Sequence, residues 1–303
     1  MKILITGALG HIGSYLINEL VKIKNIKKIY LIDNISNQRF PVIFRLKNKK
    51  VHFIYGDLTS EKIINKIPKT NIVIHLASIT DAEGSFNIKQ KIFKNNIGSF
   101  KNILKYCLKY KSKLIHISST SVYGQQENLV TEKAKNLFPQ SPYAKIKLKE
   151  ETILKTQNKI KYITLRFGTI SGFSEGMRFH TAVNKFCFNS ITKLPIPIWG
   201  NALNLYRPYL SLYDAAKVIK FIIKNKYFPN DIFNVLSENK TVKQILSEIK
   251  KNKIKIKLKF VNSKIKNYFS FITSKNKIEK LGLKLNAKIS KDIKDTLKNL
   301  KHF

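Results

Sequence analysis

Short apolar runs rich in Ile, Leu and Val alternate with longer stretches of helical period, and this alternation constrains the fold more than any other feature of the chain. Parallel strands joined by crossover helices produce such a pattern. The expected strands of the first half are 3–6, 28–33, 51–55, 72–76, 113–118 and 161–166, and the expected helices are 11–24, 60–67, 86–110 and 141–157. The strands are apolar throughout, as is typical of strands buried on both faces. The pattern predicts the α/β class with a doubly wound parallel sheet.

A change of pattern in the second half indicates a second, smaller lobe. Segment 168–208 is rich in Gly, Pro and aromatic residues, after which an expected helix at 212–225 and strand at 232–235 resume the first pattern. Residues 254–261 alternate apolar side chains with lysines, which predicts a strand with one solvated face. We therefore expect a sheet domain built from 1–166 and about 209–235, and an α+β lobe built from about 167–208 and 236–303.

The chain is strongly basic, with 57 Lys and Arg against 18 Asp and Glu and a formal net charge of +39. Only five of the basic residues are arginines, and the lysines are spread over the whole length. Proteins that recognise nucleic acids favour arginine and gather their charge on one face. We interpret the lysines as a solvated surface and expect no specific nucleic-acid partner; weak association of the lysine-rich segment 241–303 with acidic surfaces is the alternative.

The cysteine content and the start of the chain bear on the compartment. Two cysteines, Cys107 and Cys187, cannot build a disulfide framework, which favours a reducing environment. The first strand-like run begins directly after Met1, without the charged start and apolar core of a signal peptide. No apolar run approaches the roughly 20 residues that span a bilayer. We expect a cytoplasmic protein with no membrane span.

Three glycines, Gly7, Gly10 and Gly13, lie between the first expected strand and the first expected helix. Glycine permits the tight turn, lets backbone amides approach a pyrophosphate at the helix N-terminus, and lets the helix pack close to the sheet. Asp33 ends the second strand, where a carboxylate binds both ribose hydroxyls and repels a 2′-phosphate. Asp57 follows the third strand and is placed to reach the adenine amino group. These residues predict NAD rather than NADP; the alternative for Asp33 is an aspartate that only caps its loop.

A serine, a tyrosine and a lysine form the expected catalytic group. Ser119 lies in the run SSTSVYG after a strand, and Tyr143 and Lys147 are four residues apart on one helical face. A free tyrosine titrates near 10 and is a poor base at neutral pH. A cation at about 4 Å lowers that pKa by roughly 3 units at an effective dielectric of 20. Lys147 and an oxidised nicotinamide would therefore make the phenol a usable base. A core aromatic beside a solvated lysine is the alternative.

The motifs GALGHIG, GDL at 56–58, HLAS at 75–78, SSTSVYG, SPYAKIK and LRFG follow one another over nearly the whole chain. In this order they are similar to those of the extended short-chain dehydrogenase/reductase family, in its NAD-dependent nucleotide-sugar epimerase/dehydratase branch, which includes the UDP-glucose/UDP-galactose 4-epimerases. The resemblance implies a Rossmann-type sheet, NAD as cofactor and a nucleotide-diphosphate sugar as substrate. It also implies a homodimer, because in many relatives the helices matching 86–110 and 141–157 form a four-helix interface.

The same resemblance implies roles for individual residues. Tyr143 is the expected catalytic base, Lys147 its activator and a ligand of the nicotinamide ribose, and Ser119 a hydrogen-bond partner of the reacting hydroxyl. The expected cofactor-binding residues are Gly7, Gly10, His11, Ile12, Gly13, Asp33, Asn34, Asp57, Leu58, Leu76, Ala77, Ser78, Asn95, Tyr143 and Lys147. The expected substrate-binding residues are Thr80, Ser119, Thr120, Arg178, Asn184 and Arg207, with Arg207 as a diphosphate clamp. We expect His180 to be packed rather than catalytic, and no metal site, because no His/Cys cluster has metal-ligand spacing.

Some positions depart from the family pattern. Relatives often have asparagine where Thr169 follows the LRFG motif. Many also carry a second phosphate-binding arginine near 264–275, where this chain has only lysines, with Lys264 and Lys266 as the nearest candidates. These differences predict a diphosphate site that is weaker or differently arranged.

The residues after Ser119 limit which reactions of the family this chain is expected to catalyse. The 4,6-dehydratases have an Asp-Glu pair there, because elimination of water needs an additional acid and base; here the positions hold Thr120 and Ser121. The glutamate typical of the decarboxylases and the cysteine of the fucose synthases are also missing. Reversible oxidation of a sugar hydroxyl, normally at C4, remains. The sequence predicts a 4-epimerase, with a net dehydrogenase or reductase as the alternative. A non-catalytic NAD-binding or RNA-binding relative would be expected to have lost Tyr143 or Lys147.

Overall fold

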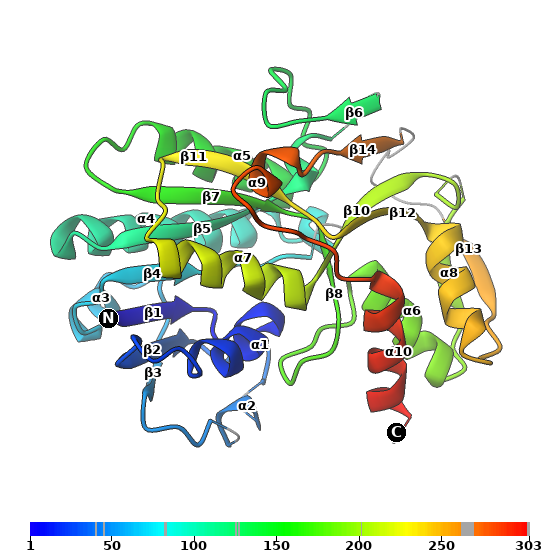
Figure 1. The fold of residues 1–303 in the computed structure, drawn as a ribbon, viewed down its shortest axis with the longest axis horizontal. Helices are drawn as coiled ribbons and strands as arrows, with labels where there is room; N and C mark the ends of the chain where they lie inside the picture. Colours follow the sequence, from blue (N-terminus) through cyan, green and yellow to red (C-terminus); the bar gives the residue numbers. More distant parts are fainter. Residues whose placement is uncertain are drawn as a thin grey trace.

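A seven-stranded parallel sheet forms the larger part of the molecule (Figure 1). The computed structural model describes residues 1–39, 41–44, 46–81, 84–124, 126, 128–200, 202–261 and 270–301. Across the sheet the strands are β3 (Val51–Tyr55), β2 (Lys28–Asp33), β1 (Lys2–Thr6), β4 (Ile72–His75), β5 (Lys113–Ser119), β7 (Tyr162–Phe167) and β11 (Asp231–Val235). Every neighbouring pair is parallel. The order reverses between β1 and β4, as in the doubly wound Rossmann topology, so the predicted fold class is confirmed.

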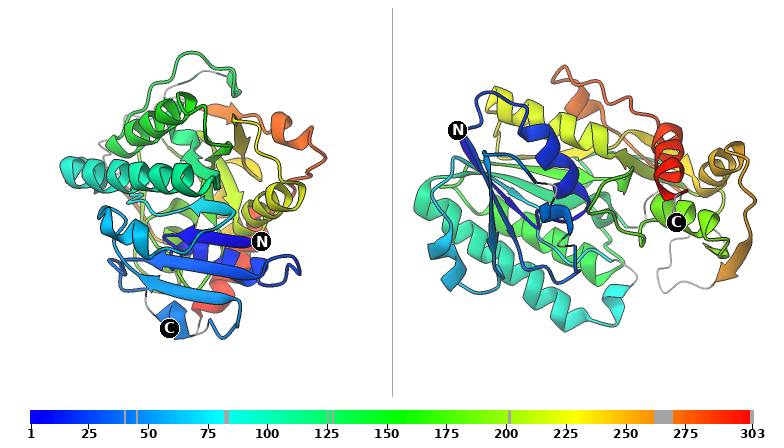
Figure 2. Two further views of the ribbon diagram at one scale, coloured as in Figure 1. Left: turned by 90° about the vertical axis from the view of Figure 1, so that its left-hand side faces the viewer. Right: turned by 90° about the horizontal axis from the view of Figure 1, so that it is seen from below.

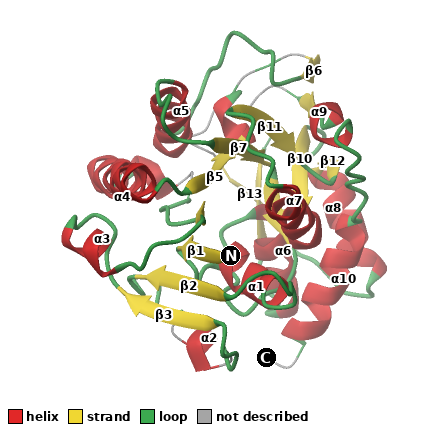
Figure 3. Ribbon diagram, turned by 60° about the vertical axis from the view of Figure 1, so that its left-hand side comes forward, coloured by secondary structure: helices red, strands yellow, loops and turns green. Residues whose placement is uncertain are grey.

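Helices cover both faces of this sheet (Figure 3). On one face lie α1 (His11–Leu20) and α7 (Leu212–Asn225), and on the other α3 (Lys62–Lys66), α4 (Lys89–Tyr110) and α5 (Pro142–Lys155). Ile3 and Ile5 of β1 pack toward α1 and α7, whereas Leu4 packs toward α3 and α4. Both sides of each strand are therefore buried, which explains why the strand sequences are apolar throughout.

A smaller lobe lies beyond the carboxyl ends of the strands (Figures 1 and 2). Its sheet consists of β12 (Glu238–Thr241), β10 (Tyr206–Ser211) and β8 (Thr169–Ser171), and β13 (Leu258–Val261) pairs with β9 (Ile196–Trp199). The helices α6 (Ala182–Ile191), α8 (Val242–Lys251) and α10 (Ile289–Leu300) enclose a separate apolar core. The amphipathic pattern of α10 explains this packing, because Ile289, Ile293, Leu297 and Leu300 lie on one buried face.

Some segments of the second half pack against the large sheet. Strand β14 (Phe271–Thr273) pairs with β6 (Asn128–Val130), and Ile278 of α9 (Asn276–Glu279) joins the core beside α7. Leu283 and Leu285 join the same core. The short elements that complete the described chain are α2 (Pro41–Phe44) and the 3₁₀ turns η1 (Gly84–Phe86) and η2 (Thr120–Val122). The exact division of the chain into domains stays a prediction.

The boundaries of the first-half elements differ from the predicted ones by a few residues, but the strand expected over 254–261 was wrong in its first half. Only Leu258–Val261 forms a strand. Its partner β9 begins at Ile196, and the Ile196 amide donates to the Lys257 carbonyl as the last bond of the ladder. Ile254 and Ile256 instead pack against the small-lobe core. The alternation records packing there rather than strand pairing.

Two further observations concern the compartment predictions. Among the described residues, no helix is both long enough and apolar enough to cross a membrane. Cys107 and Cys187 are both buried and carry free thiols. Burial raises the pKa of the Cys187 thiol to about 12, so it stays protonated at neutral pH.

Candidate active site

A cavity of about 1050 Å³ lies between the carboxyl ends of the parallel strands and the smaller lobe. Ligands of open α/β sheets bind at this edge, where the strand order reverses. The loops after β1, β2, β3, β4, β5 and β7 all contribute to its lining. Of the predicted site residues, all except Asn184 line this one cavity. The structure thus brings the predicted cofactor, catalytic and substrate residues together.

The glycine turn lies at one end of the cavity and closely approaches neighbouring backbone. Gly7 has φ of +61°, and a Cβ added to it would lie 2.7 Å from the Ala77 backbone. A Cβ on Gly13 would lie 2.3 Å from the Ala8 carbonyl oxygen. Gly10 is the N-cap of α1. It has no side chain to cover the free backbone amides of the first turn of α1. This end of the cavity fits a dinucleotide pyrophosphate, because no side chain of Gly10 covers the α1 N-terminus and the Arg39 guanidinium lies only 3.9 Å from where a Gly10 Cβ would be.

Two aspartates follow the next strands and are held by their own loops. Asp33 accepts hydrogen bonds from the amides of Leu9 at 3.1 Å and Ile35 at 2.9 Å. Burial raises the pKa of Asp57, but the Thr59 amide and hydroxyl and the Asn34 amide outweigh it, so the pKa lies below its usual range. Both aspartates line the cavity, in the places that the sequence predicted for binding of the adenosine.

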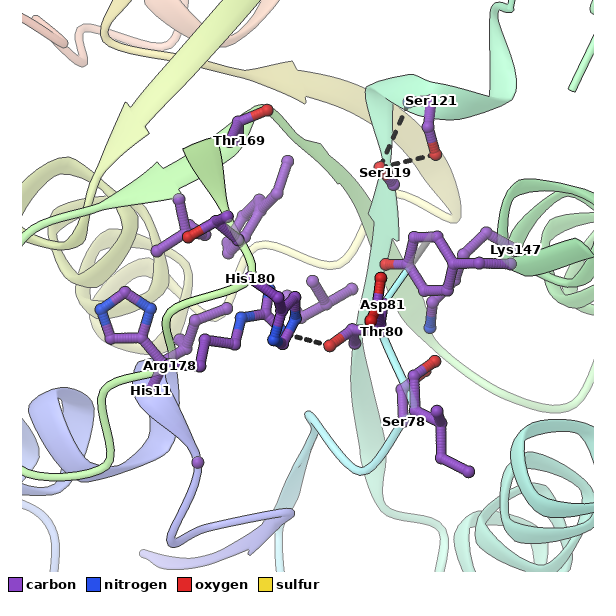
Figure 4. A pocket seen from close by; sticks show the side chains of 18 of the residues that line it. His11, Ser78, Thr80, Asp81, Ser119, Ser121, Lys147, Thr169, Arg178 and His180 are labelled. Carbon is purple, nitrogen blue, oxygen red and sulfur yellow. Dashed lines mark hydrogen bonds between the residues drawn. The ribbon is translucent and has the colours of Figure 1, made fainter. Parts of the chain in front are cut away.

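The predicted catalytic residues converge from two elements (Figure 4). Ser119 ends β5, and its Oγ accepts hydrogen bonds from the Ser121 amide at 3.2 Å and the Ser121 hydroxyl at 2.9 Å. Its own proton is left to donate into the cavity. Tyr143 and Lys147 lie on α5, which begins at the N-cap Ser141. The Lys147 ammonium lies 6.0 Å from the centre of the Tyr143 ring. The three groups surround a space in which a sugar hydroxyl can meet both a proton donor and a base.

Arg178 enters the cavity from the loop before α6 and faces the catalytic group (Figure 4). Its guanidinium donates to the Thr80 hydroxyl. Burial lowers the pKa of Arg178 to about 10, while Tyr143 acts in the opposite direction. At neutral pH Arg178 is therefore a buried cation close to the Tyr143 phenol. Burial, with Arg178 nearby, lowers the pKa of His180 to about 4, so this residue is uncharged at neutral pH.

The remaining predicted substrate residues differ in how far they are exposed to the cavity. Arg207 on β10 lines it, with its guanidinium stacked 5.5 Å from the Phe271 ring centre. The Thr120 hydroxyl donates to the Phe167 carbonyl at 3.3 Å. Asn184 is completely buried behind the cavity, and its amide donates to the Arg178 carbonyl at 3.2 Å. Lys264 and Lys266 lie outside the described residues.

Several functional candidates escaped the sequence analysis. Arg39 lines the cavity between Asp33 and Arg178. The chain has only five arginines, and this rarity could have indicated that Arg39 has a function. Beside the predicted Asn95, Asn96 holds the loop after β4, because its side chain bonds both the amide and the carbonyl of Ile79. Within the described part of the chain, no group of three or more His, Cys, Asp or Glu residues could hold a metal ion.

The combination of a Rossmann sheet, a glycine turn at α1, Ser119 at the end of β5, and Tyr143 and Lys147 on α5 defines a nicotinamide-dependent enzyme of the short-chain dehydrogenase/reductase type. Within that class, the chain belongs to the NAD dependent epimerase/dehydratase family, whose family model matches residues 3–235. The predicted family and the predicted NAD cofactor are thereby confirmed.

Known proteins of several specificities resemble the chain. The uncharacterized UDP-glucose epimerase YtcB of Bacillus subtilis is 28% identical over 247 residues, which are 78% of this chain and 76% of that protein. The ADP-L-glycero-D-manno-heptose-6-epimerase of Brachyspira hyodysenteriae is 30% identical over 77% of this chain and 74% of its own length. The UDP-glucuronic acid 4-epimerase of Bacillus cereus, solved with UDP-glucuronic acid and NAD, has a TM-score of 0.87 and 25% identity, covering 100% of this chain and 99% of that one. The chain spans less than half the length of several multifunctional relatives.

Proposed function

We propose that this chain is an NAD-dependent nucleotide-sugar epimerase that inverts a sugar carbon, C4 in the first instance, by transient oxidation. The observation that carries the proposal is the shared cavity, in which the glycine turn, the Ser119, Tyr143 and Lys147 group and Arg207 are continuous. Its volume of about 1050 Å³ is at the upper end of ordinary ligand sites. This leaves room for a cofactor and a substrate together.

Tyr143 is the proposed base of the oxidation step. Its phenolate removes the proton of the sugar hydroxyl while Ser119 donates a hydrogen bond to the same oxygen. NAD, when bound, would supply the hydride acceptor for the oxidation and the hydride donor for the reduction. Lys147 stabilises the phenolate, and its ammonium would also hold the nicotinamide ribose. Tyr143 would give the proton back when the keto sugar is reduced on its opposite face, so the overall reaction is redox-neutral.

The residues beside Ser119 favour epimerisation over elimination. Thr120 and Ser121 carry no carboxylate, and their hydroxyls bond the Phe167 carbonyl and Ser119. They therefore supply neither the acid nor the base that removal of water requires. A net dehydrogenase or reductase is the second candidate, because it uses the same three catalytic groups and differs only in releasing the keto sugar.

The test is incubation of the purified protein with UDP-, ADP-, GDP-, dTDP- and CDP-sugars, including UDP-glucuronic acid, with and without added NAD. We expect one substrate to give its epimer without net formation of NADH, measured by proton NMR and absorbance. Stoichiometric NADH formation would support the dehydrogenase instead. No conversion of any sugar, in a preparation that binds NAD, would contradict the proposal. Tyr143→Phe is the matched inactive control.

We also propose a homodimer in which α4 and α5 of two copies pack together. The two helices lie side by side on one face of the sheet (Figure 2), and Phe93 and Leu108 of α4 are 44% and 41% exposed. Exposed lysines on both helices would repel across such an interface, so salt should strengthen it. Light scattering at low and high salt should give a dimer mass that Phe93→Ser with Leu108→Ser reduces to a monomer.

The proposed compartment is the cytoplasm. Two buried free thiols are compatible with a reducing environment. Localisation of a tagged full-length protein by fractionation tests this, and recovery in a secreted or membrane fraction would contradict it.

A further inference from the structure

Glu150 is a buried carboxylate on α5 that has no part in the mechanism above. Its Oε2 lies 2.8 Å from the Lys147 ammonium and 3.0 Å from Nε2 of His116. The side chains of Glu150 and Lys147 are 1% and 3% exposed. A charge at such depth is costly to bury, and the cost is offset only by close partners. Glu150 is therefore tied to the one cation that the proposed chemistry requires.

His116 on β5 completes this group as a hydrogen-bond partner of Glu150. Its Nδ1 lies 3.3 Å from the Thr164 hydroxyl, and its ring packs 5.1 Å from the ring of Phe100. A neutral imidazole satisfies both contacts when Nε2 donates to Glu150 and Nδ1 accepts from Thr164. Lys147 and Glu150 then form a buried pair of zero net charge, held on the β5 side by a neutral donor.

We propose that Glu150 is a positioning residue that anchors the Lys147 ammonium and, by cancelling part of its charge, sets the pH at which the Tyr143–Lys147 pair releases its proton. The inference rests on the proposed roles of Tyr143 and Lys147. Glu150 touches neither substrate nor cofactor and acts through Lys147. One N–H of the ammonium is committed to Glu150, which leaves two to point toward Tyr143 and the cofactor.

The electrostatics follow from the geometry. Burial lowers the pKa of Lys147, but Glu150 and Tyr143 raise it more, so the ammonium persists. Burial raises the pKa of Glu150, and Lys147 with His116 lowers it below its usual range. Both ions are thus maintained. An ammonium paired with a carboxylate stabilises the Tyr143 phenolate less than a bare one does, because the two charges oppose each other at the phenol.

Removing the Glu150 carboxylate should shift the pKa of the Tyr143–Lys147 pair in one direction. Tyr143 and Lys147 titrate as a coupled pair, so the observed pKa belongs to both. A lost negative charge disfavours bound protons nearby, whichever of the two groups releases one. The first deprotonation of the pair therefore moves to lower pH when Glu150 becomes neutral.

Other titratable or charged groups face the Tyr143–Lys147 pair from each neighbouring element. They are His75 on β4, His116 on β5, Glu151 on α5, Arg166 on β7, and Asp81 and Arg178 across the cavity. Burial lowers the pKa of His75 to about 3, so it stays neutral. Arg166 holds the Glu151 carboxylate through two hydrogen bonds of 2.6 and 2.9 Å and compensates its charge. Glu150 is therefore the carboxylate that directly contacts the Lys147 ammonium, and replacing it with a neutral residue changes the charge beside Lys147.

The test compares wild type with Glu150→Gln, which keeps the shape and removes the charge. The pKa of Tyr143 is followed by phenolate absorbance in the NAD complex, with Tyr143→Phe as the reference for the other tyrosines. We expect this pKa, and the acidic limb of the pH–rate profile once a substrate is known, to fall by about one pH unit. The absorbance needs no substrate, so the inference and the proposed function can fail separately.

Two further variants separate charge from anchoring. Glu150→Met fills a similar volume without charge and should shift the pKa like Glu150→Gln, which provides the measurement if the amide variant does not fold. Glu150→Asp keeps the charge but moves it away from the Lys147 ammonium. The pKa of Tyr143 should therefore stay within about 0.3 unit of the wild-type value. NAD affinity, measured by calorimetry, should fall several-fold, because the ammonium is no longer held in place. An unchanged or raised pKa in either neutral variant, or wild-type NAD affinity in Glu150→Asp, would overturn the proposal.

Discussion

The two ends of the cavity are built in different ways. At the cofactor end, Asp33 and Asp57 each hydrogen-bond residues of the sheet domain within their own or adjoining loops. At the substrate end, Arg178 reaches across from one lobe to Thr80 of the other. Arg207 stacks on Phe271, which lies on a strand paired with β6. The cofactor end depends on local geometry, whereas the substrate end exists only when distant segments are assembled.

Because the two ends are built differently, mutations at each end should affect different binding properties. The cofactor end changes little when the small lobe changes, because its hydrogen bonds are completed within the sheet domain. The cations of the substrate end are Arg178, in the loop before α6, and Arg207 on β10. Both elements belong to the smaller lobe. We therefore expect mutations at the first end to alter NAD affinity or chemistry, and those at the second to alter affinity for the nucleotide sugar.

The largest expected effect is that of Tyr143→Phe. The ring and its packing remain, but the group that takes the hydroxyl proton is lost, so turnover should fall by roughly 10²- to 10⁴-fold. NAD affinity should change little, because Lys147 is retained. Tyr55→Phe, at a tyrosine that is 69% exposed on β3, is the matched control and should behave as wild type. Near-normal turnover of Tyr143→Phe would remove the proposed base.

Arg207→Lys should break the substrate end alone. Lysine keeps the charge but loses the planar fork and the stacking on Phe271, so KM for the nucleotide sugar should rise by roughly 10- to 100-fold. The NAD dissociation constant should stay at the wild-type value. Lys243→Gln removes one exposed charge from the same lobe and is the control. A parallel loss of NAD affinity in Arg207→Lys would show that the two ends are not independent.

Asp33→Asn sharpens the comparison at the cofactor end. The wild type should bind NAD at least about tenfold more tightly than NADP, a difference of about 1.4 kcal/mol, because Asp33 repels a 2′-phosphate. In the variant the repulsion disappears while Arg39 remains nearby, so calorimetry should give similar affinities for both cofactors. Equal affinities in the wild type would exclude Asp33 from the ribose site.

The smallest effect is expected at Asp292, which joins α10 to β8 and β10 within the smaller lobe. Its carboxylate accepts from the hydroxyls of Ser171 at 2.5 Å and Ser211 at 2.9 Å, and burial raises its pKa to about 6. The folded protein binds this proton more tightly than the unfolded chain, whose value is near 3.8. The associated stability is therefore complete below pH 3.8 and lost as pH rises through 6.

Asp292→Asn should remove this pH dependence. At pH 7 we expect its free energy of unfolding to exceed that of the wild type by about 1 kcal/mol, with equal values near pH 4, measured by urea denaturation. Turnover should be unchanged at both pH values. A variant less stable than wild type at pH 7 would mean that the ionised carboxylate contributes more through hydrogen bonds than its burial costs.

Local sequence was enough to assign the residues of the proposed cofactor end to one cavity, because the relevant distances are short along the chain. A strand, a glycine turn and a helix follow one another within residues 2–20, and Tyr143 and Lys147 share a face at a spacing of four. The carboxyl ends of parallel strands share one edge, so Asp33 and Ser119 could be assigned to the same site without coordinates.

Tertiary structure alone decided the remainder. The contact of Arg178 with Thr80 joins residues 98 positions apart, and that of Glu150 with His116 joins residues 34 apart on a helix and a strand. The alternation at 254–261 could not show that its first half lacks a strand partner, because hydrogen bonding of a ladder depends on where β9 begins. Side-chain periodicity is a property of neighbours along the chain. The partners that lie far apart in the sequence, for buried charge as for strand edges, are fixed only when distant segments pack, because the desolvation of these groups is offset in part by residues that the local sequence does not contain.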